Sequence, residues 1–387
     1  MSAVALLGTV LLIVWIVLVF FWHGFWRMDV RLPAAGMIPL RGGRWPSVVV
    51  LVPARNEEET LKVALTSLLA QDYPGDFHVI VINDNSTDAT AEIAREMAAT
   101  SHERLTAIDA PPRPAGWMGK MAALQAGYEH VQADPRLSQA RYVWLTDADI
   151  RHDADALRRL VHLAEGERRD LVSALVRLHC ESVWEKLLIP PFVYFFFLLY
   201  PPRAVMRPDR YAAGAAGGCL LLRKEVLEDI GAFAAVHDAV IDDCAIARKV
   251  KDRGYRLWLG LTEVSRSLRA YPDLADLWRM IARSAYAQLA YSPLLLLLSL
   301  AGLLFAFVLP ALYALGFIFG DAAAHFTGLV AFGLMTASML PVIRFYDLAR
   351  FWSLTLPVAA VLYGVITLSS ALDHHRGKGI SWRDSPS

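Results

Sequence analysis

The stretch that decides the fold runs from Arg141 to Ile150 and reads Arg-Tyr-Val-Trp-Leu-Thr-Asp-Ala-Asp-Ile. Tyr142 to Leu145 is a short apolar run of β-branched and aromatic residues, which is typical of a strand buried on both faces. This strand leads directly into Asp147 and Asp149. Ligands of open α/β sheets bind beyond the carboxyl ends of the strands, so we expect both carboxylates at a binding site.

Two aspartates one residue apart can hold a hard divalent ion and leave coordination positions for water and a diphosphate. The pair therefore indicates metal-assisted handling of a nucleoside diphosphate. A solvated turn after a strand would give the same two residues. The interpretation depends on the motifs that surround the pair in the rest of the chain.

The composition describes a catalytic domain joined to membrane segments. The chain has 387 residues, of which 56% are hydrophobic and 20% charged, and its net charge is zero. No basic block is present, so nothing favours a nucleic-acid partner. The three cysteines, Cys180, Cys219 and Cys244, show neither zinc-site spacing nor an even count, which favours a reduced, cytosolic setting for the central part.

The N-terminal residues 1–26 predict a membrane anchor. Val4 to Trp22 is almost wholly apolar, and a helix of this length matches a hydrocarbon core of about 30 Å. No basic region and no small-residue cleavage site mark it as a signal peptide. The next segment carries four arginines, which by the positive-inside rule place the following domain in the cytoplasm: Arg27, Arg31, Arg41 and Arg44.

Residues 46–270 are predicted to form one α/β domain. Strands alternate with helices at a spacing typical of a parallel, doubly wound sheet with Rossmann-like layering. The first strand is not followed by Gly-x-Gly-x-x-Gly, which argues against a dinucleotide redox cofactor. The expected strands cover 48–52, 78–82, 106–108 and 142–145, and the expected helices cover 56–71, 88–100 and 120–131.

Polar residues follow the first and second strands. Pro53 and Ala54 turn the chain out of the sheet, and the helix expected from Asn56 would offer backbone N–H groups and polar side chains to grip a base and ribose. An ordinary helix N-terminus would explain the same residues. Asp84, at the end of the second strand, is placed to accept hydrogen bonds from the base or ribose, while Ser86 or Asp88 caps the next helix.

Three later motifs add chemistry. Lys120 opens the third helix, whose N-terminus would favour a phosphate, although a surface lysine is the plain alternative. Gly217 and Gly218 precede an apolar strand and permit close backbone approach to a ligand, or simply a tight turn. Asp242 and Asp243 stand at the start of a helix; one can cap it, and the second can act as a general base on an acceptor hydroxyl.

Apolar segments dominate the C-terminal third. Leu187 to Tyr200 is apolar and aromatic but interrupted by prolines, and it predicts an interfacial segment, an acceptor groove or a core helix. Residues 271–290 are read as an interfacial helix that carries Arg279 and Arg283 on one face. Spans are expected at 294–317, 328–342 and 351–372, within a membrane region 291–372. With the anchor this gives four crossings and puts the tail, 373–387, outside, against the positive-inside rule.

Together these motifs resemble those of inverting family 2 glycosyltransferases with the GT-A fold. The membrane layout is similar to that of the ceramide glucosyltransferase-like branch and, within it, to the hopanoid-associated glycosyltransferases of bacteria. The resemblance covers nearly the whole chain. It rests on the stretches that begin at Val52, Asn83, Asp147, Gly217 and Ile241.

The resemblance implies a role for each matching position. Pro53, Arg55, Glu57 and Asp84 look like the nucleotide-binding residues, to which Lys120, Asp147 and Arg283 are added as candidates for the donor diphosphate. Asp147 and Asp149 are similar to the metal pair, with Mg²⁺ or Mn²⁺ as the ion. Asp243 looks like the catalytic base, supported by Asp242.

One departure bears on processivity. Processive members carry Gln-x-x-Arg-Trp, whereas this chain reads Met280-Ile281-Ala282-Arg283-Ser284, which keeps the arginine and loses the glutamine and tryptophan. The sequence therefore predicts an inverting hexosyltransferase of the inner membrane, with a cytoplasmic catalytic domain, that transfers one sugar from a UDP-sugar to a lipid hydroxyl. A processive polysaccharide synthase and a non-catalytic nucleotide-sugar-binding scaffold are the alternatives.

Overall fold

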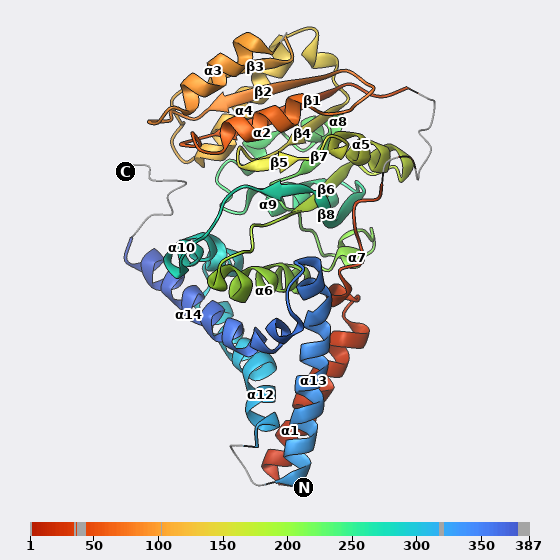
Figure 1. Cartoon of the computed structure of the whole chain (residues 1–387), viewed down its shortest axis with the longest axis vertical. Helices are drawn as coiled ribbons and strands as arrows, with labels where there is room; N and C mark the ends of the chain where they lie inside the picture. The colour runs from red at the N-terminus through yellow and green to blue at the C-terminus, as the bar shows by residue number, and fades with distance from the viewer. Residues whose placement is uncertain (1, 35, 37–43, 102, 317–320, 378–387) are drawn as a thin grey trace. The chain divides into compact units, whose positions relative to one another are not determined.

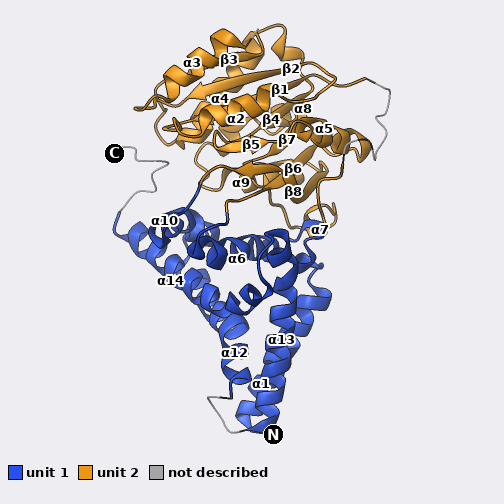
Figure 2. Cartoon of the chain, in the orientation of Figure 1, with its two compact units in different colours: residues 1–29, 180–203, 270–380 blue, residues 30–179, 204–269, 381–387 orange. Residues whose placement is uncertain are grey.

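The computed structural model describes residues 2–34, 36, 44–101, 103–316 and 321–377. They divide into two compact units (Figures 1 and 2). The sheet unit comprises residues 30–179 and 204–269, and the helical unit comprises residues 1–29, 180–203 and 270 onward. Arg41, Phe317 and residues 378–387 of the predicted tail lie outside the described residues.

The sheet unit is built on a mixed sheet of eight strands in the order β3-β2-β1-β4-β7-β6-β8-β5. The first four neighbours are parallel, as predicted, and β7 is antiparallel to both β4 and β6. The sheet is therefore not parallel throughout. The strands are β1 Val48–Ala54, β2 Phe77–Asn83, β3 Leu105–Asp109, β4 Tyr142–Leu145, β5 Ile150–His152, β6 Leu171–Arg177, β7 Leu220–Arg223 and β8 Leu257–Ser267.

Burial explains the central strands. Every residue of β1 and β4 is buried, as expected for apolar runs covered by helices on both faces. The helices of this unit are α2 Leu61–Leu69, α3 Thr90–Thr100, α4 Gly119–Ala133, α5 Ala156–Gly166, α8 Lys224–Asp229 and α9 Asp242–Asp252, and the short α7 Pro202–Val205 straddles the boundary between the units.

One predicted helix boundary is wrong. Helix α2 was expected from Asn56, but it begins at Leu61. Asn56 has φ +51°, a left-handed conformation that cannot continue into a right-handed helix. The residues between β1 and α2 therefore form an irregular loop at the edge of the sheet.

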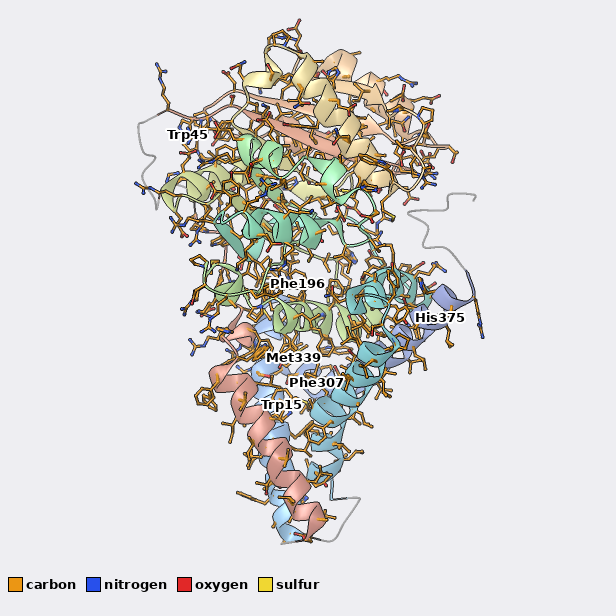
Figure 3. The ribbon with its side chains drawn as sticks, turned by 180° about the vertical axis from the view of Figure 1, so that it is seen from behind. Trp15, Trp45, Phe196, Phe307, Met339 and His375 are labelled. Carbon is orange, nitrogen blue, oxygen red and sulfur yellow. The ribbon has the colours of Figure 1, made fainter. Side chains whose placement is uncertain are left out.

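The helical unit surrounds an aromatic core. Trp15 packs edge to face on Phe307 at 5.6 Å between ring centroids, and Figure 3 shows both rings close to Met339. Tyr194 shares a buried hydrogen bond of 2.8 Å with Ser338. The helices are α1 Ala3–Ile16, α6 Val183–Leu199, α10 Leu274–Ala285, α11 Pro293–Leu303, α12 Leu309–Ala314, α13 Ala322–Phe345 and α14 Leu356–His375, with π-helical turns at Val17–Phe21 and Leu304–Val308.

Helix α6 corrects a second expectation. Pro190 and Pro191 were expected to interrupt the apolar segment, but both lie inside the helix. Its N-terminus is closed by a capping box in which the Ser182 side chain accepts from the Glu185 amide and the Glu185 carboxylate accepts from the Ser182 amide, satisfying two N-terminal amides at once. The same carboxylate accepts from the Tyr271 amide at 2.7 Å.

In the described residues, five helical segments are long and apolar enough to cross a membrane. They are Ala3–Phe21, Val183–Val205, Pro293–Ala314, Ala322–Phe345 and Arg350–His375. Four of them coincide with the predicted spans, and the fifth is the α6 segment.

Helix α13 offers a test of close packing in the helical unit. A Cβ on Gly328 would collide with Tyr313, whereas a Cβ on Gly333 would meet nothing within 4 Å. We expect Gly328→Leu to lower the thermal stability of the detergent-purified protein by roughly 1–3 kcal/mol through overpacking. Gly333→Leu on the same helix is the matched control. Equal melting temperatures of the two variants, measured by size-exclusion chromatography after heating, would contradict the close packing of Gly328 on Tyr313.

Candidate active site

The carboxyl ends of three parallel strands bring the predicted nucleotide residues to one edge of the sheet. Strands β1, β2 and β4 are neighbours and run in the same direction, so the residues that follow them emerge side by side. Arg55, after β1, donates from Nη1 to Asp84 Oδ2 at 3.3 Å. Asp84 is buried, and this pairing compensates its charge. Pro53 lies within β1 itself.

The loop after β1 is fixed by the loop after β2. The amide of Asn56 donates to Ser86, the amide of Glu57 to Thr90 at 2.7 Å, and the amide of Glu58 to Asp88. These backbone groups were expected to grip a base and ribose. They instead bind side chains of the neighbouring loop, so any nucleotide contact falls to side chains.

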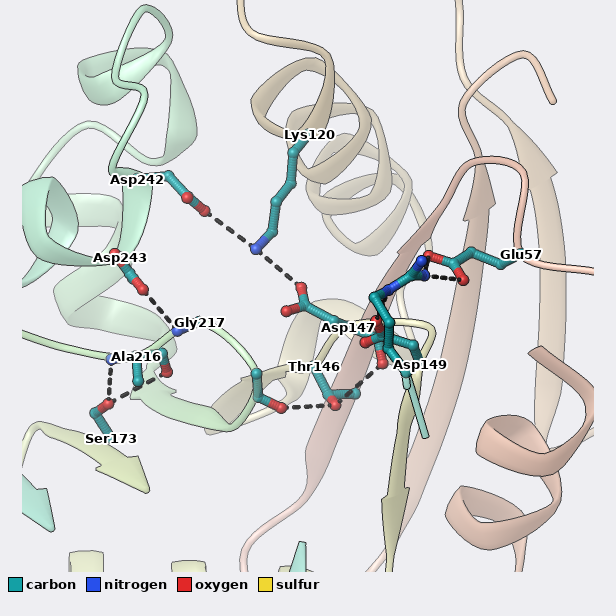
Figure 4. Close-up of polar contacts among 12 residues, drawn as sticks. Glu57, Lys120, Thr146, Asp147, Asp149, Ser173, Ala216, Gly217, Asp242 and Asp243 are labelled. Carbon is teal, nitrogen blue, oxygen red and sulfur yellow. Dashed lines mark hydrogen bonds and ion pairs between the residues drawn. The ribbon is translucent and has the colours of Figure 1, made fainter. Parts of the chain in front are cut away.

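Lys120 joins two of the predicted motifs. It stands in the first turn of α4, and its Nζ lies 2.9 Å from Asp147 Oδ1 and 3.3 Å from Asp242 Oδ2 (Figure 4). Burial lowers the pKa of Lys120, but the carboxylates of Asp147 and Asp242 outweigh burial and hold the pKa well above its usual value. The lysine therefore stays charged between the metal motif and the Asp-Asp motif.

Asp243 is a partly buried carboxylate that two backbone amides hold in place. Its Oδ2 accepts from the Gly217 amide at 2.8 Å and its Oδ1 from the Cys244 amide at 2.7 Å (Figure 4). Burial, followed by the charge of Asp242, raises the pKa of Asp243 to about 7. A Cβ on Gly217 would lie 3.1 Å from Lys120 Nζ, so the glycine leaves room for the ammonium group. The result is a carboxylate that can take up and release a proton near neutral pH.

A small cavity lies between these groups. It is lined by polar residues from three predicted motifs together with apolar side chains of α4, β4, β7 and α9. The predicted site residues among its lining are Pro53, Lys120, Asp147, Asp242 and Asp243.

Arg269 is a site residue that the sequence did not reveal. Its Nε donates to Asp149 Oδ2 at 2.8 Å, and its Nη2 donates to Glu57 Oε2 at 2.9 Å. Burial and the charge of Asp149 raise the pKa of Glu57 to about 8, against the opposing charge of Arg269. The arginine follows β8 by two residues, and no motif accompanies it. A single basic residue after an apolar strand does not by itself indicate a functional site.

A buried histidine supports the metal loop from behind. His152 Nε2 lies 2.8 Å from Thr146 Oγ1, and His152 Nδ1 lies 2.8 Å from Ser265 Oγ. Because the Thr146 hydroxyl donates to the Gly218 carbonyl, Nε2 carries the proton and Nδ1 accepts one from Ser265. Burial lowers the pKa of His152 to about 3. This neutral network connects β8, the residue before Asp147 and the glycine loop.

Comparison with known proteins agrees with this geometry. Residues 49–231 match the family described as Glycosyl transferase family 2. The similarity to this family covers just under half of the chain. The match ends before Asp242, Asp243 and Arg269, so their place in the site rests on the structure.

Two curated relatives match a short part of the chain. The 4,4'-diaponeurosporenoate glycosyltransferase of Staphylococcus aureus (strain bovine RF122 / ET3-1) is 39% identical over 84 residues, which is 22% of this chain and 20% of the relative. The "Probable glycosyltransferase YdaM" of Bacillus subtilis (strain 168) is 38% identical over 90 residues, 23% of this chain and 21% of the relative. The matched stretch thus spans about a fifth of each relative's length.

A solved structure shares the fold. The mannosyltransferase PcManGT from Pyrobaculum calidifontis, in complex with GDP-Man and Mn²⁺, superposes with a TM-score of 0.55 and 22% sequence identity over 95% of this chain and 99% of that chain. At this identity the likeness shows the fold. The predicted GT-A-like α/β domain, flanked by apolar helices toward both termini, is therefore confirmed.

The carboxylates of the sheet unit could supply some, but not all, of the ligands of a hard divalent ion. Asp147 and Asp149 supply two carboxylates, and no group of three or more His, Cys, Asp or Glu side chains that could hold a metal occurs among the described residues. Such a pair suits an ion whose remaining ligands are water and phosphate oxygens. Arg283 belongs to α10 of the helical unit, and its role toward the diphosphate stays a prediction.

The His152 network predicts a pH-dependent stability. The folded-state pKa lies below the unfolded value of about 6.5, so the neutral imidazole stabilises the fold fully above that pH. As the pH falls from 6.5 toward 3, the unfolded chain binds a proton that the folded chain does not, and up to about 1.4 kcal/mol is lost per pH unit.

We expect His152→Gln to flatten the decline in melting temperature between pH 7 and pH 5. The control is His130→Gln, a half-buried histidine of α4, which should decline as the wild type does. Parallel curves for all three proteins would show that His152 does not resist protonation.

Proposed function

We propose that the protein is a membrane-bound inverting glycosyltransferase that moves one hexose from a nucleoside diphosphate sugar, with UDP as the expected nucleotide, to the hydroxyl of a lipid. The observation that carries this proposal is Asp243, a partly buried carboxylate with a pKa near 7 on the same cavity as Lys120 and Asp147. A module that only bound the nucleotide sugar would have no use for such a base.

Asp243 would act as the general base. It would take the proton of the acceptor hydroxyl as that oxygen attacks the anomeric carbon, while the bond from the anomeric carbon to the diphosphate oxygen breaks on the opposite face. One displacement inverts the configuration, and the sugar never becomes bonded to the protein. Lys120 would face the charge that develops on the diphosphate, which is where a fixed cation lowers the barrier most.

Binding of the donor would be divided among the other residues. Arg55 and Asp84, already paired, would hold the base and ribose through their side chains, next to Pro53 and Glu57. Mg²⁺ or Mn²⁺ held by Asp147 and Asp149 would supply Lewis-acid stabilisation of the departing diphosphate. Support comes from the neighbour PcManGT, whose structure is a complex with GDP-Man and Mn²⁺.

The acceptor is proposed to be a membrane lipid, with a hopanoid as the first candidate. The resemblance in sequence suggests this class, and the relative from Staphylococcus aureus is named for another lipid, 4,4'-diaponeurosporenoate. The apolar helices toward both ends of the chain would place the protein in the inner membrane, with the sheet unit in the cytoplasm. Helix α6, with Phe196 near its end, would border the path of the acceptor.

The base is tested with Asp243→Asn. We expect this variant to release nucleoside diphosphate in the presence of lipid about 10²–10⁴-fold more slowly than wild type. Its affinity for the nucleotide should stay within a few-fold of wild type. The assay should use UDP-sugars and GDP-mannose, with and without a bacterial lipid extract that contains hopanoids. Turnover by the variant at the wild-type rate would exclude Asp243 as the base.

The pH dependence gives an independent check on the same residue. Asp243 accepts a proton only when ionised, and its pKa is raised to about 7. We therefore expect kcat/KM to fall about tenfold per pH unit below 7 and to level off above it. A profile that stays flat from pH 7 down to pH 5 would contradict the assignment.

Arg269 provides a test of the metal pair that needs no turnover. Its hydrogen bond holds the carboxylate of Asp149, and loss of such an outer partner typically weakens a metal site 10–100-fold. We expect Arg269→Met to lower Mn²⁺ affinity by about this factor, measured by electron paramagnetic resonance of free and bound Mn²⁺. Arg253→Met, which breaks the exposed pair with Asp229, is the control. Tighter binding by Arg269→Met would mean that the guanidinium competes with the ion.

A further inference from the structure

The α6 segment is long and apolar, but the sheet forbids it to carry the chain across a bilayer. Strand β6 ends at Arg177, before α6, and β7 begins at Leu220, after it. The two strands are hydrogen-bonded neighbours, with Leu171 opposite Leu222. A single crossing between them would place the two strands on opposite sides of a hydrocarbon core about 30 Å thick. Of the five candidate spans, Val183–Val205 is therefore not a crossing.

The covalent links to the sheet unit all leave from one end of the helical unit, which we call the linked face. The chain enters the sheet unit after Phe25–Arg27, and it leaves at Arg269 just before α10. Helix α13 packs against Phe25–Arg27 and against α6, and near its C-terminal end Ser338 bonds Tyr194 of α6. The C-terminal end of α13, with Arg344, thus belongs to this face.

The chain approaches α14 from the same face, because residues 346–355 directly follow α13 and Arg350–Thr355 packs against α13. Its middle lies within the apolar bundle: a Cβ on Gly364 would be 3.4 Å from Leu300 of α11. The Tyr363 hydroxyl donates to the Leu188 carbonyl of α6 at 2.9 Å. One face of the helix therefore packs against apolar neighbours along its first half.

The far end of α14 comes back to that face. Ser370 Oγ donates to the Ala282 carbonyl of α10 at 2.6 Å, and Tyr286 Oη lies 3.2 Å from His375 Nε2. These partners precede α11, whose first residue is Pro293, so they mark the end from which α11 enters the membrane. Figure 1 shows α14 ending beside α10, and Figure 3 places His375 at that end.

We infer that α14 enters the cytoplasmic leaflet and returns to the cytoplasmic face without crossing, so that the chain crosses the membrane three times, through α1, α11–α12 and α13. This inference rests on the membrane location proposed above and not on the proposed transferase activity. It replaces the four crossings expected from hydropathy. It also places the tail, with Arg376, Lys378 and Arg383, on the cytoplasmic side, in agreement with the positive-inside rule.

The surface of α14 fits contact with one leaflet. Five apolar side chains recur at helical spacing along one side, each 42–55% exposed: Val358, Val361, Val365, Leu368 and Leu372. The residues between them pack inward. This stripe would lie against acyl chains of the cytoplasmic leaflet, and Arg376 and the tail cations would lie at its anionic headgroups.

The test is cysteine labelling of the full-length protein in intact cells. We expect Ser387→Cys to react with a membrane-impermeant maleimide only after the cells are permeabilised. Ala323→Cys, at the exposed start of α13, should react in intact cells, because α11–α12 delivers the chain to the outer face. The unmodified protein, with its three native cysteines, gives the background.

The outcomes separate the possible failures. Labelling of Ser387→Cys in intact cells would restore the fourth crossing and overturn the inference. Failure of both variants to label before permeabilisation would overturn it as well, and would remove the proposed membrane orientation. In either case the transferase assay with Asp243→Asn is unaffected, so the proposed activity stands or falls separately.

Discussion

The site depends on the two ion pairs that the ammonium group of Lys120 forms. This group lies between Asp147, which follows β4, and Asp242, which begins α9. Besides Asp84, which pairs with Arg55, five carboxylates gather at this edge of the sheet, and in a medium of low dielectric their mutual repulsion would be severe without fixed cations. Lys120 and Arg269 divide that task. Lys120 neutralises the side of the site next to the candidate base, and Arg269 neutralises the side next to Glu57.

The sheet brings these charges together through one antiparallel strand, β7. Strands β1, β2 and β4 deliver the nucleotide residues at their carboxyl ends. Strand β7 then runs antiparallel to β4, so that the loop before β7, with Gly217, meets the loop after β4. Asp243 is held by that loop through the Gly217 amide. The mixed topology is thus what places a base from one part of the chain opposite a metal motif from another.

Much of this could be read from the sequence because the signals were local. The apolar run before Asp147 fixed β4, and alternation of strands and helices gave the first four parallel neighbours. Asp84, Lys120 and Asp243 could be singled out because each stands where a strand ends or a helix begins.

The rest depended on contacts between distant residues. Arg269 lies 120 positions from Asp149 in the chain, and no local pattern reports such a pairing. Asn56 was expected to start a helix because acids follow it, yet its left-handed backbone prevents this. Hydropathy counts apolar residues but cannot tell whether a helix crosses a bilayer or turns back, so α6 and α14 needed the sheet pairing and the contacts with α10.

The insertion of α6 between β6 and β7 has a consequence for how the protein is made. Strand β7 lies between β4 and β6 in the sheet, so β6, β8 and β5 join the first four strands only through it. During synthesis β7 emerges after α6. The pairing of β7 with β4 and β6 can therefore form only after the ribosome has released α6, an apolar helix that partitions into lipid. Until then the edge of β4 is open to wrong pairings. Delivery of α6 to the bilayer and completion of the sheet therefore become a single event in biogenesis, and a defect in insertion would appear as aggregation of the soluble half.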